Sequence, residues 1–191
     1  MVNICNNWYK MEVEETHLKG CYVVSPEVIE DDRGCFFESF NKKEFEAQTG
    51  IVINFVQDNE SKSSRGVLRG LHYQNGIHAQ AKLVRVVKGS VLDVCVDLRI
   101  YSQTYGKHFS ILLDGVKKQQ LYIPKGFAHG FLVLENDTVF SYKCDAFYNK
   151  SSEQGIRFDD KTLNIDWNFP ESELILSKKD MELQTFKELF K

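Results

Sequence analysis

The sequence has 191 residues, of which 42% are hydrophobic and 27% are charged, and its formal net charge is −3. This length suits one domain with a substantial core, so we predict a single domain over residues 1–191. The small negative charge gives no general attraction to nucleic acid or to an anionic membrane. No apolar run approaches the ~20 residues that span a bilayer. We therefore expect neither nucleic acid nor a membrane as a partner.

The N-terminus and the cysteines bear on the cellular compartment. Residues 1–11 lack a basic start and an apolar stretch, so we predict an N-terminal arm and no signal peptide. The five cysteines are odd in number and form no Cys-x-x-Cys pair, which argues against a zinc knuckle or a thioredoxin-type site. Cys95 and Cys144 fall in apolar, strand-like runs that are typical of reduced core thiols. We therefore predict a cytoplasmic protein.

Short strands separated by turn signals dominate the sequence from Val13 onward. The first is Tyr22-Val23-Val24, and a helix follows that Asn41 caps and Gly50 closes. Further strands are predicted at Ile53–Gln57, Val67–Gln74, Ala81–Lys88, Val91–Asp97, His108–Leu113, Gln120–Ile123, Gly130–Leu134 and Val139–Ala146. The helical spacing of Leu183, Phe186 and Leu189 predicts a C-terminal helix over residues 180–190. This pattern predicts an all-β jelly roll, a β-sandwich or barrel with a few short flanking helices, whose sheets enclose a cavity.

Strand periodicity places two polar side chains among apolar neighbours. Lys82 shares a strand face with Val84 and Val86, and Tyr142 shares one with Phe140 and Cys144. We therefore predict that Lys82 and Tyr142 point inward.

Arg69 and His72 pose a geometric problem. They are three residues apart, so a regular strand would place them on opposite faces. If both serve one site, the strand must be irregular, and Gly70 between them is the predicted position of a β-bulge.

Three of these residue types could together move a proton at a carbon next to a carbonyl group. A histidine such as His72 can take up a proton at neutral pH. A cation such as Lys82 can stabilise the anion left behind, and a tyrosine such as Tyr142 can return a proton from another direction.

Each candidate also has a structural interpretation that the residues alone leave open. His72 could be a hydrogen-bonded strand residue, Lys82 a solvated strand end, and Tyr142 a core tyrosine. His129 could cap a strand end, and Asp180 fits a capping box that begins at Ser177. The sequence offers no supporting pattern for the other three histidines, which we interpret as structural: His17, His78 and His108.

Metal and cofactor motifs are missing from the sequence. Gln74 stands two residues after His72, and no His-x-His pair occurs anywhere. A lysine in the same cavity would repel a divalent cation, so we predict no metal site. No Gly-rich phosphate-binding loop is present, and we predict no cofactor.

Ordered short motifs run through most of the chain. They are Asp32–Glu38, Phe55–Asn59, Val67–Tyr73, Lys82–Val84, Val94–Arg99, Ile123–Phe131, Tyr142-Lys143 and Leu176–Asp180. In these motifs the sequence resembles the dTDP-4-dehydrorhamnose 3,5-epimerase family, a cupin-type jelly-roll family of deoxysugar-nucleotide biosynthesis. The resemblance extends from about Glu14 to Asp180 and implies a cupin-like jelly roll.

The resemblance implies catalytic roles at matching positions. His72 would be the general base, oriented by Asp180, and Tyr142 would be the general acid on the opposite side of the sugar ring. Lys82, with Arg69, would lie near the C4 carbonyl oxygen and stabilise an enolate.

The resemblance also implies binding roles and an assembly. Gln57 and Asn59 would line the sugar and phosphate region, and His129 would contact sugar or phosphate. Tyr148 would stack on thymine, with Glu153 at the nucleotide end of the site. Arg33 and Glu38 would bind the nucleotide by reaching into the neighbouring subunit's site, which implies a homodimer, although from the residues alone they could also be an ordinary surface pair.

The implied reaction is the epimerisation of dTDP-4-dehydro-6-deoxy-D-glucose at C3 and C5 to dTDP-4-dehydro-L-rhamnose. Three alternatives stay open: a single-site epimerase acting at C3 or C5, a 3,4-ketoisomerase of a related dTDP-sugar, and a non-catalytic sugar-binding cupin. A non-catalytic sugar-binding cupin would keep the cavity and lose the base or the acid. This sequence has both a candidate base, His72, and a candidate acid, Tyr142.

Overall fold

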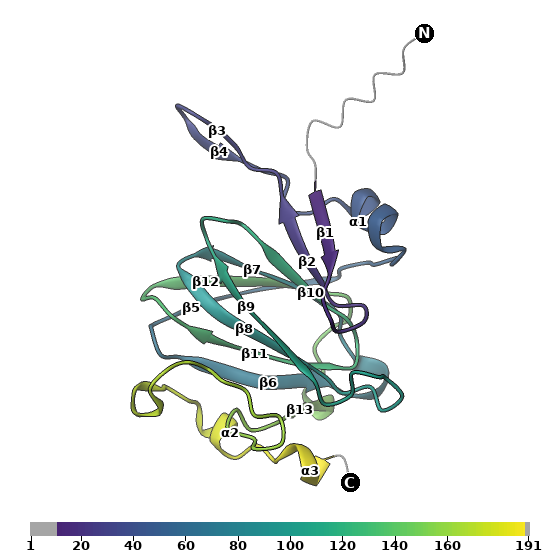
Figure 1. Cartoon of the computed structure of the whole chain (residues 1–191), viewed down its shortest axis with the longest axis vertical. Coiled ribbons are helices and arrows are strands. Elements are labelled where there is room, and N and C mark those ends of the chain that lie inside the picture. Colours follow the sequence, from purple (N-terminus) through teal and green to yellow (C-terminus); the bar gives the residue numbers. More distant parts are fainter. Residues whose placement is uncertain (1–10, 190–191) are drawn as a thin grey trace.

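The computed structural model describes residues 11–189 as two antiparallel β-sheets that face each other, with short helices at the periphery (Figure 1). The first sheet has the order β1-β2-β10-β7-β12-β5, with bounds Met11–Glu15, Tyr22–Pro26, Gln120–Ile123, Lys82–Lys88, Thr138–Cys144 and Gln57–Ser63. The second has the order β13-β6-β11-β8-β9, with bounds Glu153–Gly155, Leu68–Gln74, Phe127–Val133, Ser90–Asp97 and His108–Asp114. This arrangement confirms the predicted jelly roll.

The main core lies between the two sheets. Val84 and Phe140 from the first sheet pack there with Cys95 and Phe131 from the second. A second apolar cluster, which includes Leu68 and residues of the C-terminal segment, covers the outer face of the second sheet. Cys95 and Cys144 are buried free thiols, as predicted.

The helix α1 (Lys42–Thr49) forms where it was predicted. The Asn41 side chain accepts hydrogen bonds from the backbone N–H groups of Lys43 and Glu44, and Gly50 closes the helix in the left-handed conformation. Phe45 is the buried residue of α1, in an apolar cluster on the outer face of the first sheet. Only Met11 of the predicted N-terminal arm is described, and it begins β1; the rest of the arm lies outside the described residues.

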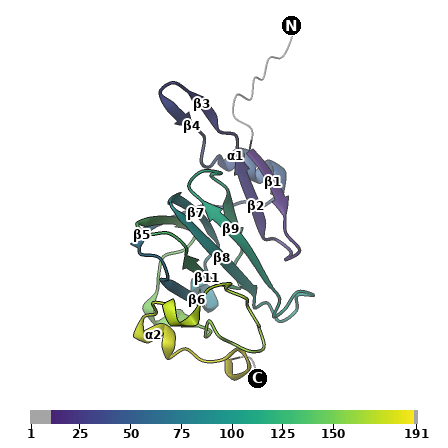
Figure 2. The same cartoon turned by 60° about the vertical axis from the view of Figure 1, so that its left-hand side comes forward.

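A hairpin of β3 (Ile29–Asp31) and β4 (Gly34–Phe36) projects from the body of the sandwich (Figures 1 and 2). The two strands pair with each other and with no other described strand.

The predicted strand Ile53–Gln57 is wrong, because β5 begins only at Gln57 and continues to Ser63. Ile53 is buried and Phe55 packs partly buried in the apolar cluster that also contains Phe45 of α1. The apolar spacing that suggested a strand therefore reflects packing against α1. The other predicted strands are confirmed, and their largest shift is at β11, which begins at Phe127 and not at Gly130.

The single C-terminal helix predicted over residues 180–190 is also wrong. Two short helices form instead, α2 (Lys178–Met181) and α3 (Phe186–Leu189), and residue 190 lies outside the described residues. Between them Gln184 pairs with Ile156 in a β-bridge. The Asp160 carboxylate accepts the backbone N–H of Phe186 at 2.8 Å, which starts α3 as a separate helix.

The predicted bulge at Gly70 is confirmed. In the pairing of β6 with β11, His72 lies opposite His129, but Arg69 lies opposite Phe131, so β6 holds one extra residue. Gly70 has φ +124°, and a Cβ atom there would lie 2.5 Å from the Cα of Gly130. The extra residue allows Arg69 and His72 to border one cavity.

We predict that Gly70→Ala lowers the free energy of unfolding by about 2–5 kcal/mol, from backbone strain combined with the clash against β11. Gly34→Ala is the matched control, because Gly34 has φ +122° and open space around its Cβ position. Gly34→Ala should lower the free energy of unfolding only by the backbone strain, about 1–2 kcal/mol. Urea denaturation followed by circular dichroism measures both values, and equal losses would contradict the proposed close approach.

Candidate active site

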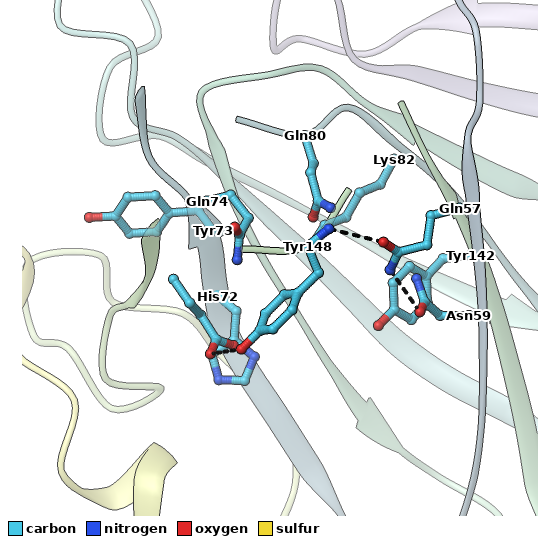
Figure 3. Close-up of a pocket in the computed structure, with 10 residues that line it drawn as sticks. Gln57, Asn59, His72, Tyr73, Gln74, Gln80, Lys82, Tyr142 and Tyr148 are labelled. Carbon is cyan, nitrogen blue, oxygen red and sulfur yellow. Dashed lines mark hydrogen bonds between the residues drawn. The ribbon is translucent and has the colours of Figure 1, made fainter. Parts of the chain in front are cut away.

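Two adjoining pockets, of about 250 and 310 Å³, open between the sheets and share the side chains of His72, Lys82 and Tyr142. The first pocket is also lined by Gln57, Asn59, Tyr73, Gln74, Gln80, Tyr148 and Glu153. The second is also lined by Glu60, Ser61, Arg69, His129, Phe131, Ser177, Lys179 and Asp180. In Figure 3 Lys82, Tyr142 and His72 point from different strands towards a common space, whereas Tyr73 points away.

His72 on β6 is fixed by a carboxylate from the far end of the chain. Its Nε2–H donates to Oδ1 of Asp180 at 2.5 Å. The Ser177 hydroxyl donates to Asp180 Oδ2 at 2.7 Å and accepts the Asp180 backbone N–H at 3.1 Å. Asp180 is therefore held by Ser177, the N-cap residue of α2, and is at the same time the partner of His72. With its Nε2 hydrogen directed at Asp180, the neutral imidazole carries its lone pair on Nδ1.

The charge of Asp180 is stabilised by these hydrogen bonds. Burial acts to raise its pKa, but the bonds from His72 and Ser177 outweigh burial and hold the pKa below the ordinary value. The side chain is therefore a carboxylate at neutral pH, and it orients the imidazole of His72.

Tyr142 and Lys82 face His72 from the other sheet. They lie on adjacent strands, β12 and β7, and the Lys82 Nζ is 5.8 Å from the centroid of the Tyr142 ring. Their predicted inward orientation is confirmed, because both line the cavity. Burial raises the pKa of Tyr142, so its hydroxyl keeps its proton at neutral pH.

Lys82 forms no ion pair with any residue that the structure describes. Burial lowers its pKa, and the negative charges of nearby acidic groups, Asp93 and Glu153, oppose that shift. A lysine in this setting is well placed to receive an anion that forms in the cavity. Arg69 lines the same pocket as Lys82 and donates from Nη2 to the Ser63 hydroxyl at 3.3 Å.

His129 is held by an acidic residue that sequence reasoning missed. Its Nε2–H donates to Oδ2 of Asp93 at 2.9 Å, and only 6% of the His129 side chain is exposed. Its ring stacks on Phe140, with centroids 6.1 Å apart and an interplanar angle of 19°. Asp93 could have been found from its strand parity, because it shares the inward face of β8 with Val91 and Cys95.

A chain of hydrogen bonds fixes the outer part of the cavity. The Tyr148 backbone N–H donates to Gln57 Oε1 at 2.9 Å, and Gln57 Nε2 donates to Asn59 Oδ1 at 3.0 Å. The Tyr148 hydroxyl donates to Glu153 at 2.8 Å, and Glu153 pairs with Lys179 at 2.5 Å. Lys179 was also missed by sequence reasoning, although it stands directly before Asp180.

Arg33 and Glu38 do not line either pocket. Arg33 lies on the turn of the β3–β4 hairpin and pairs with Asp31 of the same hairpin. Glu38 accepts a hydrogen bond from the Asn41 side chain at 2.9 Å. Within one chain, the structure thus brings together all the predicted site residues except these two.

No group of three His, Cys, Asp or Glu side chains in residues 11–189 is arranged to hold a metal ion. Within the same residues, no helix has the length and apolar character needed to cross a membrane.

Comparisons with known proteins match this geometry to one family. The family model described as dTDP-4-dehydrorhamnose 3,5-epimerase matches residues 15–188. The chain belongs to this family. The family member from Escherichia coli strain K12 is 50% identical over 182 residues, which cover 95% of this chain and 97% of that protein.

Solved structures of the family agree with the fold and confirm the cupin-type jelly roll. The dTDP-4-dehydrorhamnose 3,5-epimerase from Elizabethkingia anophelis NUHP1 is 55% identical, with a TM-score of 0.90 over 93% of this chain and 97% of that chain. The enzyme from Legionella pneumophila Philadelphia 1, solved with dTDP-4-keto-L-rhamnose, is 44% identical, with a TM-score of 0.89 over 93% of this chain and 94% of that chain.

We predict a specific pH dependence for the His72–Asp180 pair. Because the folded protein lowers the pKa of Asp180 below its ordinary 3.8, the pair stabilises the fold above about pH 4. That contribution is lost as the pH falls through the lowered pKa. The stability difference between the wild type and Asp180→Asn should therefore be largest near pH 6 and shrink towards pH 3.

Urea denaturation at a series of pH values tests this prediction. Glu182→Gln, which removes an exposed carboxylate just after α2, controls for the change in net charge. A difference between the wild type and Asp180→Asn that stays constant from pH 6 to pH 3 would show that the Asp180 charge does not stabilise the fold.

Proposed function

We propose that this protein epimerises dTDP-4-dehydro-6-deoxy-D-glucose at C3 and C5 to give dTDP-4-dehydro-L-rhamnose. The observation that carries the proposal is the placement of His72 and Tyr142 on opposite sheets, bordering one cavity together with Lys82. A sugar ring between the sheets would present one face to the base and the other to the acid. The 50% identity to the Escherichia coli epimerase supports the same substrate.

The reaction follows from the chemistry of these side chains. The C4 ketone acidifies the hydrogens on C3 and C5, and the Nδ1 lone pair of His72 removes one of them. The electron pair of the broken C–H bond moves to the C4 oxygen as an enolate, which the ammonium of Lys82 and the guanidinium of Arg69 stabilise. One such donor is typically worth ~3–4 kcal/mol in the transition state.

Inversion requires a proton from the other face. The Tyr142 hydroxyl, which burial keeps protonated, supplies that proton to the same carbon, and the carbonyl re-forms. One proton leaves and one returns, so the carbon is inverted without net oxidation. His72 then releases its proton to solvent and the Tyr142 phenolate takes one up from solvent, so the same steps at the second carbon complete the double epimerisation.

The remaining residues bind the nucleotide and the phosphates. Tyr148, half exposed at the outer end of the cavity, stacks on the thymine ring, with Glu153 beside it. Gln57 and Asn59 line the sugar and phosphate region, and His129 contacts the sugar or a phosphate. These contacts supply binding energy at a distance from the reacting carbons.

The second candidate function is single-site epimerisation at C3 or C5. The base, the acid and the lysine would serve that reaction equally well, so these three residues do not separate the two outcomes. The identity to double epimerases favours inversion at both carbons. A sugar-binding module without catalysis would not need an oriented base and a facing acid.

The test is incubation with dTDP-4-dehydro-6-deoxyglucose in heavy water, followed by NMR of the product. The wild type should incorporate deuterium at C3 and C5 and invert both carbons. Deuterium and inversion at one carbon only would identify a single-site epimerase, and no exchange at either carbon would contradict the proposal.

Two variants separate the base from the acid in the same experiment. His72→Ala should lose exchange and inversion together, each by about 10²–10⁴-fold. Tyr142→Phe keeps the ring packing and removes only the hydroxyl, so it should slow inversion more than it slows deuterium uptake. Inversion at the wild-type rate in Tyr142→Phe, or normal exchange in His72→Ala, would show that the roles are misassigned.

We also propose a homodimer in which the β3–β4 hairpin reaches a neighbouring subunit. Phe36 is 58% exposed and Ile29 is 41% exposed on this hairpin. Phe37 packs on its own chain, near the cations of Arg85 and Lys118. The exposed apolar surface of Ile29, with the exposed part of Phe36, would pack on a second copy. That contact would bring Arg33 and Glu38 of each subunit to the nucleotide in its neighbour's site.

Subunit complementation tests this arrangement. Arg33→Ala and His72→Ala should each be nearly inactive alone. If Arg33 acts in the neighbouring site, a mixed dimer contains one complete site, and mixing equal amounts restores about a quarter of wild-type activity. No recovery after subunit exchange, or a monomer of full activity by light scattering, would refute the shared site.

A further inference from the structure

The inward face of β5 is polar along its whole length. It carries Gln57, Asn59, Ser61 and Ser63 at alternate positions. Three of the four have partners: Gln57 donates to Asn59, Asn59 donates to the sulfur of Cys144, and Ser63 accepts from Arg69. The exception is Ser61.

The Ser61 hydroxyl is buried and has no hydrogen-bond partner within residues 11–189. Buried hydroxyl groups are normally paired, because leaving one unpaired costs free energy that folding does not recover. An unpaired hydroxyl in a cavity wall therefore points to a partner that does not belong to the described chain.

The surroundings of Ser61 indicate where that partner would lie. Ser61 lines the pocket of about 310 Å³ that also contains Arg69, Lys82 and Tyr142. On β12 the residue directly opposite Ser61 is Phe140, and Tyr142 is its diagonal neighbour on the same face. Ser61 therefore lies on the side of the cavity from which Tyr142 acts, close to the reacting sugar and not to the Tyr148 end.

We propose that Ser61 is a sugar-binding residue of this site, whose hydroxyl forms a hydrogen bond with an oxygen substituent of the bound hexose. A serine hydroxyl can donate to a carbonyl or ring-substituent oxygen and can accept from a hydroxyl, so either type of substituent fits. Rotation about the Cα–Cβ bond, between staggered rotamers, turns the hydroxyl from the wall into the cavity. The bond holds the ring against Tyr142, which must reach C3 and C5.

This inference rests on the proposed function for the identity of the ligand, and binding measurements test it separately. The probes are dTDP-glucose, which lacks the C4 ketone and does not react, and dTDP, which lacks the sugar. Calorimetric titration of Ser61→Ala should show dTDP-glucose bound about 3–10-fold more weakly than by the wild type, as expected for one neutral hydrogen bond. The affinity for dTDP should be unchanged.

Thermal unfolding distinguishes binding from structure. Ser61→Ala removes a hydroxyl that has no partner among the described residues, so the melting temperature of the ligand-free protein should stay unchanged or rise. Ser63→Ala removes the hydrogen-bond partner of Arg69, so it should lower the melting temperature. Ser110→Ala, an exposed serine on β9 of the other sheet, is the control for serine truncation.

Three outcomes would overturn the inference. They are an unchanged affinity of Ser61→Ala for dTDP-glucose, an equal loss for dTDP and dTDP-glucose, and a lowered melting temperature without any selective loss for the sugar nucleotide. None of them bears on the wild-type reaction in heavy water, so the inference can fail while the proposed function stands.

Discussion

The site depends on one extra residue in β6. A regular strand would alternate its side chains strictly, and Arg69 and His72, three apart, could not both face the cavity. Because of the bulge at Gly70 and Leu71, residues that are three apart in β6 lie on the same face of the strand. Leu68 and Leu71, which are also three apart, both reach the apolar cluster on the outer face of the second sheet. The burial of the two leucines therefore fixes the orientation of Arg69 and His72.

Given that geometry, electrostatics decides what the cavity can do. Asp180 and Asp93 are each tied to a histidine, and Glu153 is tied to Lys179. Lys82 has no such partner among the described residues, and burial destabilises its charge. An enolate oxygen beside Lys82 would supply the missing counter-charge only while the reaction proceeds. Such an arrangement stabilises the transition state more than the substrate, which is the requirement for catalysis.

The sequence predicted most of the strands that pack one face in an apolar core, with β1 as an exception. It failed at β5, because the inward residues Gln57, Asn59 and Ser61 line a polar cavity and the outward positions carry Asp58, Glu60 and Lys62. No hydrophobic alternation exists there to be detected. The apolar run just before it was mistaken for the strand, although its side chains pack near α1.

The site residues divide in a similar way. His72, Lys82 and Tyr142 could be proposed from residue chemistry and family motifs, because each lies in a recognisable strand. Asp93 was missed although its strand parity places it inward, where it pairs with His129. Lys179 was missed because its importance comes from a contact with Glu153, which is distant in the sequence. Local periodicity also could not show that Asp160 would start α3 and divide the C-terminal helix in two, because that hydrogen bond spans 26 residues.

The C-terminal segment connects stability to chemistry. Asp180, the partner of His72, is 108 residues away from it in sequence and belongs to a helix of only four residues, which has little stability of its own. That helix is held in place from both sides. Before it, Ile175 forms a bridge with Val67 beside β6, and after it, Gln184 forms a bridge with Ile156.

Lys179 adds a third attachment, because its bond to Glu153 ties α2 to the β13 edge of the second sheet and, through Tyr148, to the outer end of the cavity. A change in the packing of the C-terminal segment would therefore alter both the orientation of His72 and the position of Tyr148. The orientation of His72 and the position of Tyr148 are set by one packing arrangement on the outer face of β6.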